Sequence, residues 1–279
     1  MLELAKPRIV GLVTVTAAAG FYLAAPAGVG LGLFLHLLVG TVLVAAGTNA
    51  LNQVAERDVD ALMHRTARRP LPTGRVSYLT AASAAWIAGA AGVTYLATFV
   101  NGVTALIAAA TLVSYVFLYT PLKRHTSLNT LIGAVPGALP IVGGWTAAGG
   151  SLGIEAWVLF WILFLWQLPH FLALAWMYRE DYARAGLRML SVGDVDGRQT
   201  FQQAVLYGLA LLPVSLTPTV VGIAGPWYFF GALILSSWFA WAGVQAARER
   251  SNAVARKLFI TSVWYLPVLL SLMVANKVA

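Results

Sequence analysis

The segment NALNQVAERDVDALMHRTARRPLPTGR, from Asn49 to Arg75, is a polar stretch in an otherwise apolar chain. It contains three of the ten acidic residues and five of the eighteen basic residues, and it follows a long apolar run. Ionisable side chains beside a membrane-spanning segment are costly unless they bind a ligand or a partner. The contrast with the apolar flanks indicates the class of fold, and the segment itself is the first candidate for a functional site.

Composition places the chain among integral membrane proteins. It has 279 residues, of which 59% are hydrophobic and 10% charged, with a mean hydropathy of +0.78. A soluble protein of this size has far more charge. The chain has no cysteine, which excludes disulfides, thiolate metal sites and cysteine nucleophiles. Any metal must therefore be held by oxygen or imidazole ligands.

Mostly apolar runs of about 17 to 25 residues are long enough to span a membrane as helices. The sequence predicts nine such helices, near residues 9–25, 31–54, 78–100, 102–119, 127–147, 155–178, 201–224, 227–247 and 255–276. We therefore expect one all-α domain over residues 1–279, a bundle of transmembrane helices.

The distribution of basic residues predicts the orientation of this bundle. Seventeen of the eighteen Lys and Arg residues fall in loops on one side of it, and only Lys277 falls on the other. The positive-inside rule then predicts a cytoplasmic N-terminus, and we expect the bundle to lie in the cell inner (plasma) membrane. The net charge of +8 is thus an orientation signal and a contact for anionic lipid, and it does not indicate nucleic acid. Loops 55–77 and 179–200 hold seven of the ten acids, so we expect chemistry on the cytoplasmic side.

The first polar stripe lies at the end of the second predicted span. If that helix continues at 100° per residue, one face carries the side chains of Asn49, Asn52, Glu56 and Asp60. Asp58 falls on the opposite side, where we expect it to pair with a nearby arginine. Carboxylate and amide oxygens suit Mg²⁺, which also bridges to phosphate oxygens. The stripe therefore predicts a metal site.

Basic residues follow this stripe closely. Arg65, Arg68 and Arg69 come next in the chain, and Lys123 and Arg124 end the fourth span on the same side. Guanidinium groups match phosphate in a bidentate way. A metal with several arginines indicates a diphosphate ligand. The alternative is a solvated helix end that carries ordinary positive-inside arginines.

A second polar stripe begins in the sixth predicted span. On the helical wheel Gln167, His170, Tyr178 and Asp181 share one side, although Pro169 is expected to kink the helix there. A histidine inside a span is a candidate site residue. The alternative is a histidine that only satisfies a backbone carbonyl.

Four stretches carry a resemblance to a known family. They are KPR at Lys6 to Arg8, NxxxExDxD-x(4)-RTxxRPLPTGR at Asn52 to Arg75, YTPLKRxTxxN at Tyr119 to Asn129, and WQLPHFxALAWxYREDYxxAG at Trp166 to Gly186. Together they resemble the protoheme IX farnesyltransferase (heme O synthase) family of UbiA-type intramembrane prenyltransferases. The resemblance covers nearly the whole chain.

The resemblance implies a nine-helix UbiA-type bundle with a cytoplasm-facing central cavity. It implies Mg²⁺-dependent transfer of farnesyl from farnesyl diphosphate to a vinyl group of heme b. The product would be heme O, made in the heme A and heme O pathway that serves terminal oxidases. Whether a heme A synthase or an oxidase binds directly is left open.

The resemblance also implies roles for residues. The implied metal ligands are Asn52, Glu56 and Asp60 at a first site, with Asp181 at a second. The implied diphosphate contacts are Arg8, Arg65, Arg68, Arg69, Lys123 and Arg124, and the implied heme contacts are His170, Gln167 and Tyr178. The chain departs from the general UbiA pattern at Glu56, where many relatives have Asp, and in a second aspartate motif that is reduced to Tyr178-Arg-Glu-Asp181-Tyr182. The ligands of a second metal stay open.

Two other functions fit the sequence less well. One is a UbiA-type prenyltransferase that acts on a quinone precursor or chlorophyllide. The other is a non-catalytic transporter or binder of an anionic lipid or a phosphorylated ligand. A transporter is expected to carry polar residues at mid-membrane depth and charge near both faces. Here the polar groups gather at one face, which favours an enzyme.

Overall fold

This computed structural model describes residues 2–26 and 28–278. Nine helices among these residues are long and apolar enough to cross a membrane. They are α2 (Pro7–Ala24), α3 (Leu31–Ala55), α5 (Tyr78–Phe99), the continuous segment Gly102–Leu122, α8 (Asn129–Ala147), α9 (Ile154–Met177), α12 (Arg198–Val220), α13 (Pro226–Glu249) and α14 (Asn252–Ala275). The segment Gly102–Leu122 consists of α6 (Gly102–Val113), the π-helix η1 (Ser114–Tyr119) and α7 (Thr120–Leu122). The protein is a multi-pass membrane protein, and the prediction of nine spans is confirmed.

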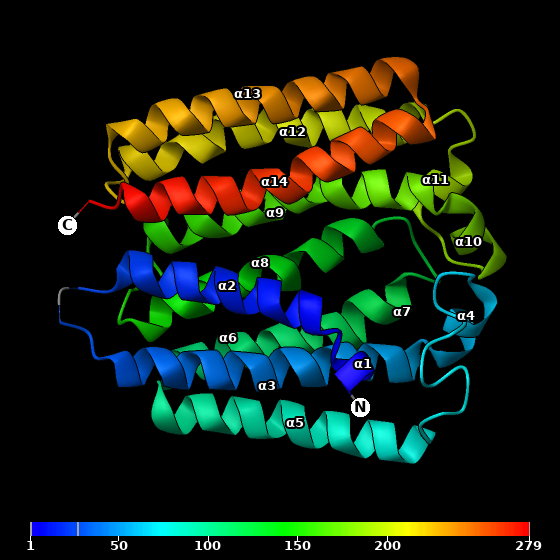
Figure 1. Ribbon diagram of the computed structural model, residues 1–279, viewed down its shortest axis with the longest axis horizontal. Helices are drawn as coiled ribbons and strands as arrows, with labels where there is room; N and C mark the ends of the chain where they lie inside the picture. Colours follow the sequence, from blue (N-terminus) through cyan, green and yellow to red (C-terminus); the bar gives the residue numbers. More distant parts are fainter. Residues whose placement is uncertain (1, 27, 279) are drawn as a thin grey trace.

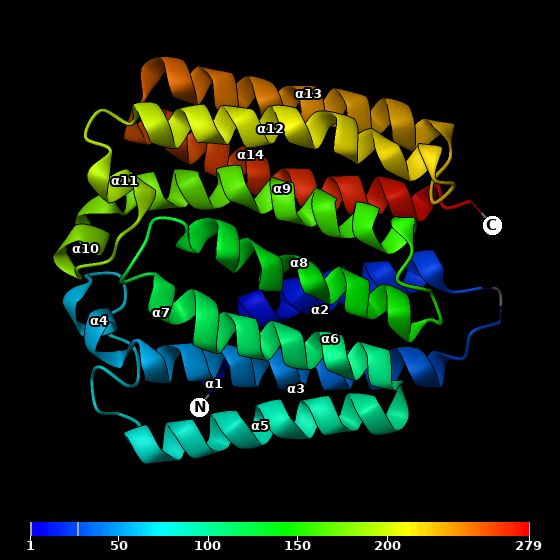
Figure 2. The same ribbon diagram turned by 180° about the vertical axis from the view of Figure 1, so that it is seen from behind.

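The structure adds four short helices outside the spans. These are α1 (Leu2–Ala5), α4 (Arg57–Leu62), α10 (Arg179–Arg184) and α11 (Leu190–Gly193). Three of them lie in the segments expected as loops 55–77 and 179–200. Figures 1 and 2 show α4, α10 and α11 together at one end of the bundle, while the C-terminus lies at the other end. The largest shift in a span is at α12, which was expected at 201–224 and runs from Arg198 to Val220.

Side-chain caps define the sharpest helix boundaries. Ser77 accepts a hydrogen bond from the backbone N–H of Thr80 at the start of α5, and Asn101 accepts one from Thr104 at the start of α6. Such caps satisfy amides that have no partner within the helix. The amide of Asn101 also donates to the carbonyl of Thr146, 2.9 Å away. The tight turn between α5 and α6 is therefore fixed to the end of α8.

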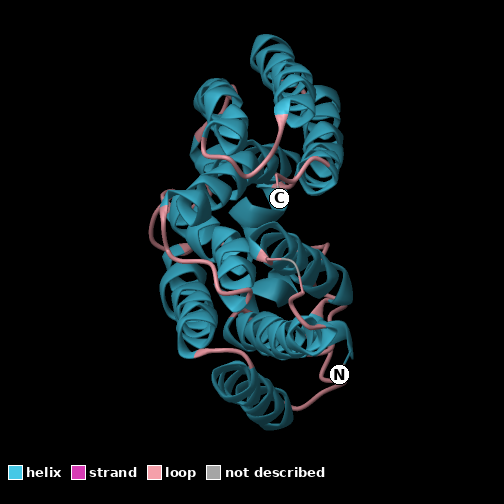
Figure 3. Cartoon of the chain, turned by 90° about the vertical axis from the view of Figure 1, so that its left-hand side faces the viewer, coloured by secondary structure: helices cyan, strands magenta, loops and turns pink. Residues whose placement is uncertain are grey.

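The long helices form two packed groups, seen nearly end-on in Figure 3. One hydrophobic core lies mainly among α9, α12, α13 and α14, and a second lies mainly among α2, α3, α5 and α6. Helix α8 packs against α2 and α6 on one side and against α9 on the other. The two halves of the bundle thus meet along α8.

Glycines allow α2 and α8 to approach closely. A Cβ atom at Gly20 would clash with the backbone carbonyl of Ile141, and one at Gly144 would clash with the carbonyl of Ala17. Backbone carbonyls cannot move aside as a flexible side chain can. Small residues at such crossings are typical of helix packing in membranes. The position of α2 against the centre of the bundle therefore depends on these glycines.

We predict that Gly20→Ala destabilises the protein by about 1–3 kcal/mol, the usual cost of overpacking. Gly11→Ala is the matched control on the same helix, since nothing lies within 4 Å of a Cβ added there. Thermal unfolding in detergent measures both variants. Equal midpoints for the two would contradict the close approach of α2 and α8.

Candidate functional site

Two adjoining cavities lie inside the bundle: a polar one near the end that carries α4 and α10, and an apolar one that extends from it toward the opposite end. The smaller, polar cavity has a volume of about 160 Å³, and the larger, apolar cavity has a volume of about 350 Å³. Both are lined by Ile9, Tyr115, Tyr119, Phe171 and Leu174. These shared residues form the junction between a polar chamber and an apolar one.

The first polar stripe lines the smaller cavity, but not on one continuous helix. Helix α3 ends at Ala55, and Glu56 has φ −101° and ψ 9° before α4 begins at Arg57. Asn52, Glu56 and Asp60 all line the polar cavity. The expectation that Asn49 belongs to the same group is wrong. Its amide donates to the carbonyl of Ala45 within α3, and the residue lines the apolar cavity.

Asp58 lies outside this group, as its opposite position on the wheel predicted. Its side chain is 89% exposed, and its nearest cation is Arg57, with 3.7 Å between Nε and Oδ1. An ion pair this exposed adds little stability. Asp58 is therefore a suitable control for the buried acids.

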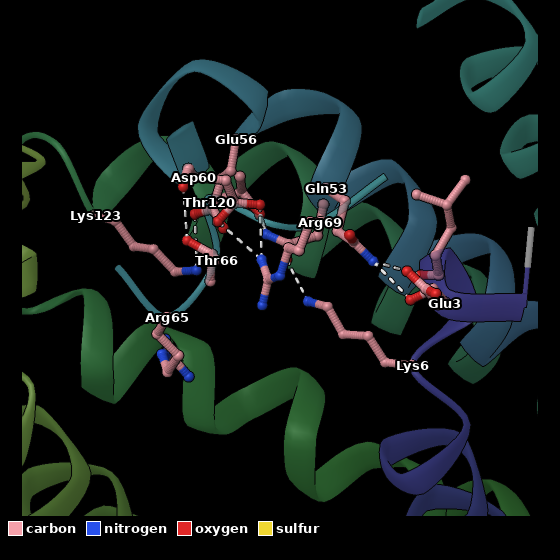
Figure 4. Close-up of polar contacts among 12 residues, drawn as sticks. Glu3, Lys6, Gln53, Glu56, Asp60, Arg65, Thr66, Arg69, Thr120 and Lys123 are labelled. Atoms are coloured by element: carbon pink, nitrogen blue, oxygen red, sulfur yellow. Dashed lines mark hydrogen bonds and ion pairs between the residues drawn. The ribbon is translucent and has the colours of Figure 1, made fainter. Parts of the chain in front are cut away.

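Each buried acid of the polar cavity pairs with a cation (Figure 4). Arg69 donates to both oxygens of Asp60, at 2.8 and 2.7 Å, from a single nitrogen. Lys123 donates to Glu56 at 2.8 Å. The site is therefore a network of alternating charge at the end of α3.

Asn52 connects this network to two other elements. It accepts a hydrogen bond from Lys6 at 2.9 Å and donates one to the hydroxyl of Thr120 at 3.2 Å. Helix α1 is itself held against α3, because the amide of Gln53 donates to the carbonyls of Glu3 and Leu4. The docking of α1 therefore places Lys6 at the cavity.

Burial and neighbouring charges shift the ionisation of these groups. Burial alone would raise the pKa of Glu56, but the ammonium of Lys123 holds this pKa below its ordinary value. Burial alone would lower the pKa of Lys123, but Glu56 raises it. Burial lowers the pKa of Lys6 to about 7, helped by the charges of Arg69 and Lys123. Glu56 and Lys123 are thus charged at neutral pH, whereas Lys6 is close to its midpoint.

Three of the six predicted diphosphate contacts line the polar cavity, namely Arg65, Arg69 and Lys123. The other three, Arg8, Arg68 and Arg124, have exposed side chains and are not among its lining residues. The cavity instead includes Lys6, which the sequence reasoning did not select. The KPR motif contains Lys6, but its spacing does not show that the chain before α2 folds back onto α3.

Asp181 is close to the site without lining either cavity. Its carboxylate accepts hydrogen bonds from the backbone N–H groups of His64 and Arg65, both at 3.3 Å, and from Arg184 at 2.7 Å. Burial opposes the charge of this group, but these donors hold its pKa below the ordinary value. Asp181 therefore fixes the segment that carries Arg65. The guanidinium of Arg65 lies 4.9 Å from the ring centre of Tyr178.

Two tyrosines at the junction were not predicted as site residues. Tyr115 and Tyr119 lie on the π-helix η1, with their ring centres 5.0 Å apart, and the ammonium of Lys123 is 4.4 Å from the centre of the Tyr119 ring. The hydroxyl of Thr120 donates to the carbonyl of Tyr115 at 2.8 Å. Single π-helical turns are frequent at functional sites. Hydropathy detects the span but not this local change of winding.

Half of the second polar stripe lines the apolar cavity. Gln167 and His170 line it, whereas Tyr178 and Asp181 do not. The amide of Gln167 donates to the carbonyls of Ala134 and Leu163. Nδ1 of His170 lies 2.8 Å from the hydroxyl of Ser262. The helical wheel placed these four residues on one face, but α9 ends at Met177. The structure therefore separates Gln167 and His170 from Tyr178 and Asp181.

The oxygen ligands fit a hard divalent cation that is shared with phosphate. Within residues 2–26 and 28–278, no cluster of three or more His, Cys, Asp and Glu residues could hold a metal alone. The polar cavity offers two carboxylates, Glu56 and Asp60, and the amide oxygen of Asn52. Mg²⁺ usually binds through one or two carboxylates and completes its coordination with water and substrate phosphates.

Comparisons with known proteins identify the family and the fold. Residues 13–266 match the UbiA prenyltransferase family. The chain is 48% identical to a protoheme IX farnesyltransferase from Solibacter usitatus, over 99% of this chain and 98% of that protein. Its fold is similar to that of a digeranylgeranylglyceryl phosphate synthase, with a TM-score of 0.83, 17% identity, and coverage of 99% of this chain and 96% of that one. It is also similar to a UbiA homolog from Archaeoglobus fulgidus bound to DMAPP and Mg²⁺, with a TM-score of 0.70, 16% identity and 98% coverage of both chains.

We predict that Asp181→Ala releases the segment that carries Arg65. Hydrogen bonds to a charged group are worth about 1.5–3 kcal/mol each, and this variant removes three of them. Hydrogen exchange should therefore become faster at the amides of His64 and Arg65, and metal-free pyrophosphate should bind more weakly.

Asp58→Ala is the control, because its exposed carboxylate makes only the long contact with Arg57. Unchanged exchange and pyrophosphate affinity in Asp181→Ala would show that the carboxylate does not position Arg65.

Proposed function

Because the chain belongs to the UbiA prenyltransferase family, we propose that it transfers farnesyl from farnesyl diphosphate to a vinyl group of heme b (protoheme IX), giving heme O. One observation carries the proposal. A polar cavity with paired acids and cations opens into a long apolar cavity, which matches a ligand with a diphosphate head and a prenyl tail. The relative from Solibacter usitatus, a protoheme IX farnesyltransferase, supports the choice of acceptor.

The diphosphate head would lie in the polar cavity. Lys6, Arg65, Arg69 and Lys123 line this space from different elements. As phosphate oxygens approach, Arg69 and Lys123 can turn from Asp60 and Glu56 to the ligand. This exchange leaves the carboxylates free for a cation, so head-group binding and metal binding support each other.

We propose Asn52, Glu56 and Asp60 as the ligands that would hold Mg²⁺. Asp181 would act from outside the cavity through Arg65. When bound, Mg²⁺ supplies positive charge that stabilises the departing diphosphate. A UbiA homolog of similar fold binds DMAPP and Mg²⁺, which supports the choice of this metal.

Cleavage of the bond between C1 of farnesyl and the diphosphate oxygen separates charge at the junction. The basic residues stabilise the diphosphate as it takes the electron pair. Tyr115 and Tyr119 lie where the allylic cation would form, and aromatic faces attract cations. The apolar cavity beyond them excludes water that would capture the cation.

The acceptor completes the reaction in two steps. The electron-rich vinyl carbon attacks C1 and forms the carbon–carbon bond, which leaves a cation on the neighbouring vinyl carbon. Water adds to that cation and loses a proton, giving the hydroxyethylfarnesyl group. We place this chemistry on the cytoplasmic side of the plasma membrane, because the basic residues gather at the end of the bundle that carries the polar cavity.

We predict that the purified protein with farnesyl diphosphate, Mg²⁺ and heme b yields heme O, detected by mass spectrometry. Omission of Mg²⁺ should remove the product. A protein that fails with heme but prenylates a phenolic acid would be a quinone-pathway enzyme. A protein that binds farnesyl diphosphate but transfers farnesyl to neither acceptor would be a binding protein or a transporter.

We predict that Glu56→Gln and Asp60→Asn each lower the turnover by at least 100-fold. Both changes keep size and shape but remove a carboxylate charge from the polar cavity. They also leave Lys123 or Arg69 without its counter-ion. Asp58→Asn on the same segment should keep normal turnover. Near-normal activity in both buried variants, measured with the same heme O assay, would remove the proposed metal site.

We expect the residues at the far end of the apolar cavity to select the length of the donor's prenyl chain. Leu37, Leu96 and Thr104 line it there, and all three are buried. A Cβ atom at Gly40 would meet the side chain of Leu96. Leu96→Ala should therefore shift the donor preference from farnesyl toward geranylgeranyl diphosphate, and Gly40→Ala should shift it toward geranyl diphosphate.

Competition among the three donors, with products separated by mass, measures this preference. Ile87→Ala is the control on α5, since its side chain is 68% exposed on the outer surface. If Leu96→Ala and Gly40→Ala shift the donor preference in the same direction, Leu96 does not set the end of the prenyl-binding space.

A further inference from the structure

The short helix α1 lies against the end of α3, beside the polar cavity. It has four residues, and a helix this short is not stable alone, because its nucleation costs more than so few hydrogen bonds return. The helical form of α1 therefore depends on the contacts that hold it to the bundle.

The side chain of Gln53 on α3 forms the polar part of this attachment (Figure 4). Its amide nitrogen donates to the backbone carbonyls of Glu3, at 3.3 Å, and of Leu4, at 2.8 Å. Carbonyls can only accept, so the amide must turn its nitrogen toward them. Gln53 is 1% exposed, and its amide oxygen has no hydrogen-bond partner among the described residues. The polar contacts of this buried amide are thus with α1.

The side chain of Leu4 forms the apolar part of the attachment. It is 2% exposed and belongs to the hydrophobic core that α3 and α5 share. Glu3 adds an ion pair with Arg75, at 3.0 Å, in which both side chains are more than half exposed. Such exposed pairs add little stability. Gln53 and Leu4 therefore make the main contribution to holding α1 in place.

Lys6 joins α1 to α2 in a conformation that this attachment imposes. Its φ of 52° and ψ of 68° are left-handed, which is uncommon for a residue with a side chain. Pro7, at the start of α2, has no N–H and prevents the two helices from joining as one. A strained backbone persists where surrounding contacts over-determine it. The turn at Lys6 would therefore relax if α1 left α3.

The docked turn places the ammonium group of Lys6 on the wall of the polar cavity. Its Nζ donates to Oδ1 of Asn52 at 2.9 Å and makes no other hydrogen bond within the described part of the chain. An ammonium group has three N–H donors, so two are left for a ligand. Arg69 and Lys123 each have a carboxylate partner, whereas Lys6 forms no ion pair with a described residue. Lys6 can thus bind phosphate without giving up a counter-ion.

We propose that α1 is a strap that closes on the diphosphate head group, with Gln53 as the residue that positions it. The inference rests on the proposed function, since the diphosphate is the head of the donor there. Docking of α1 presents Lys6 to the phosphate oxygens, and phosphate bound to Lys6 keeps α1 docked. This coupling is reciprocal, so each event strengthens the other by the same factor. Gln53 therefore acts on donor affinity without touching the donor.

The first test is the affinity of the full-length protein in detergent for inorganic pyrophosphate without metal. Lys6→Ala should weaken binding about tenfold, the effect of losing one hydrogen bond to a charged group. Gln53→Met keeps the size of the side chain but removes both N–H donors, and it should weaken binding by up to the same factor. The double variant should bind no more weakly than Lys6→Ala, because both changes act through one contact.

Gln202→Met is the control for this measurement, since Gln202 is exposed on α12 and should leave the affinity unchanged. Losses that multiply to about 100-fold in the double variant would show that Gln53 and Lys6 act independently, and would overturn the proposal. A purely structural Gln53 would lower the thermal unfolding midpoint without changing the pyrophosphate affinity, which would overturn it as well.

The second test follows α1 directly and uses the absence of cysteine from the chain. Leu4→Cys places a single thiol where it is buried while α1 is docked. Pyrophosphate should slow its reaction with a water-soluble maleimide by roughly fivefold or more, the usual range of coupling between sites. Gln53→Met should speed up the reaction, and Lys6→Ala should remove the effect of pyrophosphate. Leu2→Cys is the control, because Leu2 is 80% exposed and its labelling should not depend on pyrophosphate.

Neither test needs an acceptor, so the outcomes separate this inference from the proposed function. A wild type that makes heme O, with labelling of Leu4→Cys unchanged by pyrophosphate, overturns the strap and leaves the transferase assignment in place. Protection of Leu4→Cys by pyrophosphate, in a protein whose wild type makes no heme O, supports the strap and overturns the reaction proposed for the site.

Discussion

The structure depends on keeping opposite charges together at the end of a membrane bundle. Glu56 with Lys123 and Asp60 with Arg69 are close pairs in which the acids are almost fully buried. Such pairs add little net stability, because the cost of removing both ions from water offsets their attraction. Their value here is that two carboxylates and two cations stay assembled around one cavity. In the proposed reaction, the carboxylates would bind the metal and the cations would bind the diphosphate.

Three local features bring these charged residues close together. Helix α3 breaks at Glu56, so Asp60 is carried back over the cavity by α4. The π-helix η1 continues into α7, and Lys123 follows directly after it. Asp181, on α10, accepts hydrogen bonds from the backbone N–H groups of His64 and Arg65 and holds the segment that carries Arg65 beside the cavity. The first two features depart from a regular α-helix, and all three lie beside the polar cavity.

The sequence predicted the parts of the molecule that depend on local composition. Nine apolar runs ended at charges or turn residues, so their number and approximate bounds could be inferred from hydropathy. The pairings within the site could not be inferred in this way. Lys6 binds Asn52 from 46 residues away, and Asp181 meets the amide of His64 across 117 residues. A helical wheel relates neighbours on one helix, and it therefore misplaced Asn49 and Tyr178.

The two halves of the bundle have different roles in this arrangement. The polar cavity takes its charged residues from α4 and from the segments that follow α1, α3, α4 and α7, whereas His170 and Ser262 belong to α9 and α14. Helix α8 packs against both halves, and its glycines set how closely α2 approaches. The position of the polar cavity relative to α9 therefore depends on helix packing as well as on the residues that line the cavities. A larger residue at Gly144 would push α2 away from α8 and change the shape of the space between the two halves while leaving every residue that lines the cavities in place.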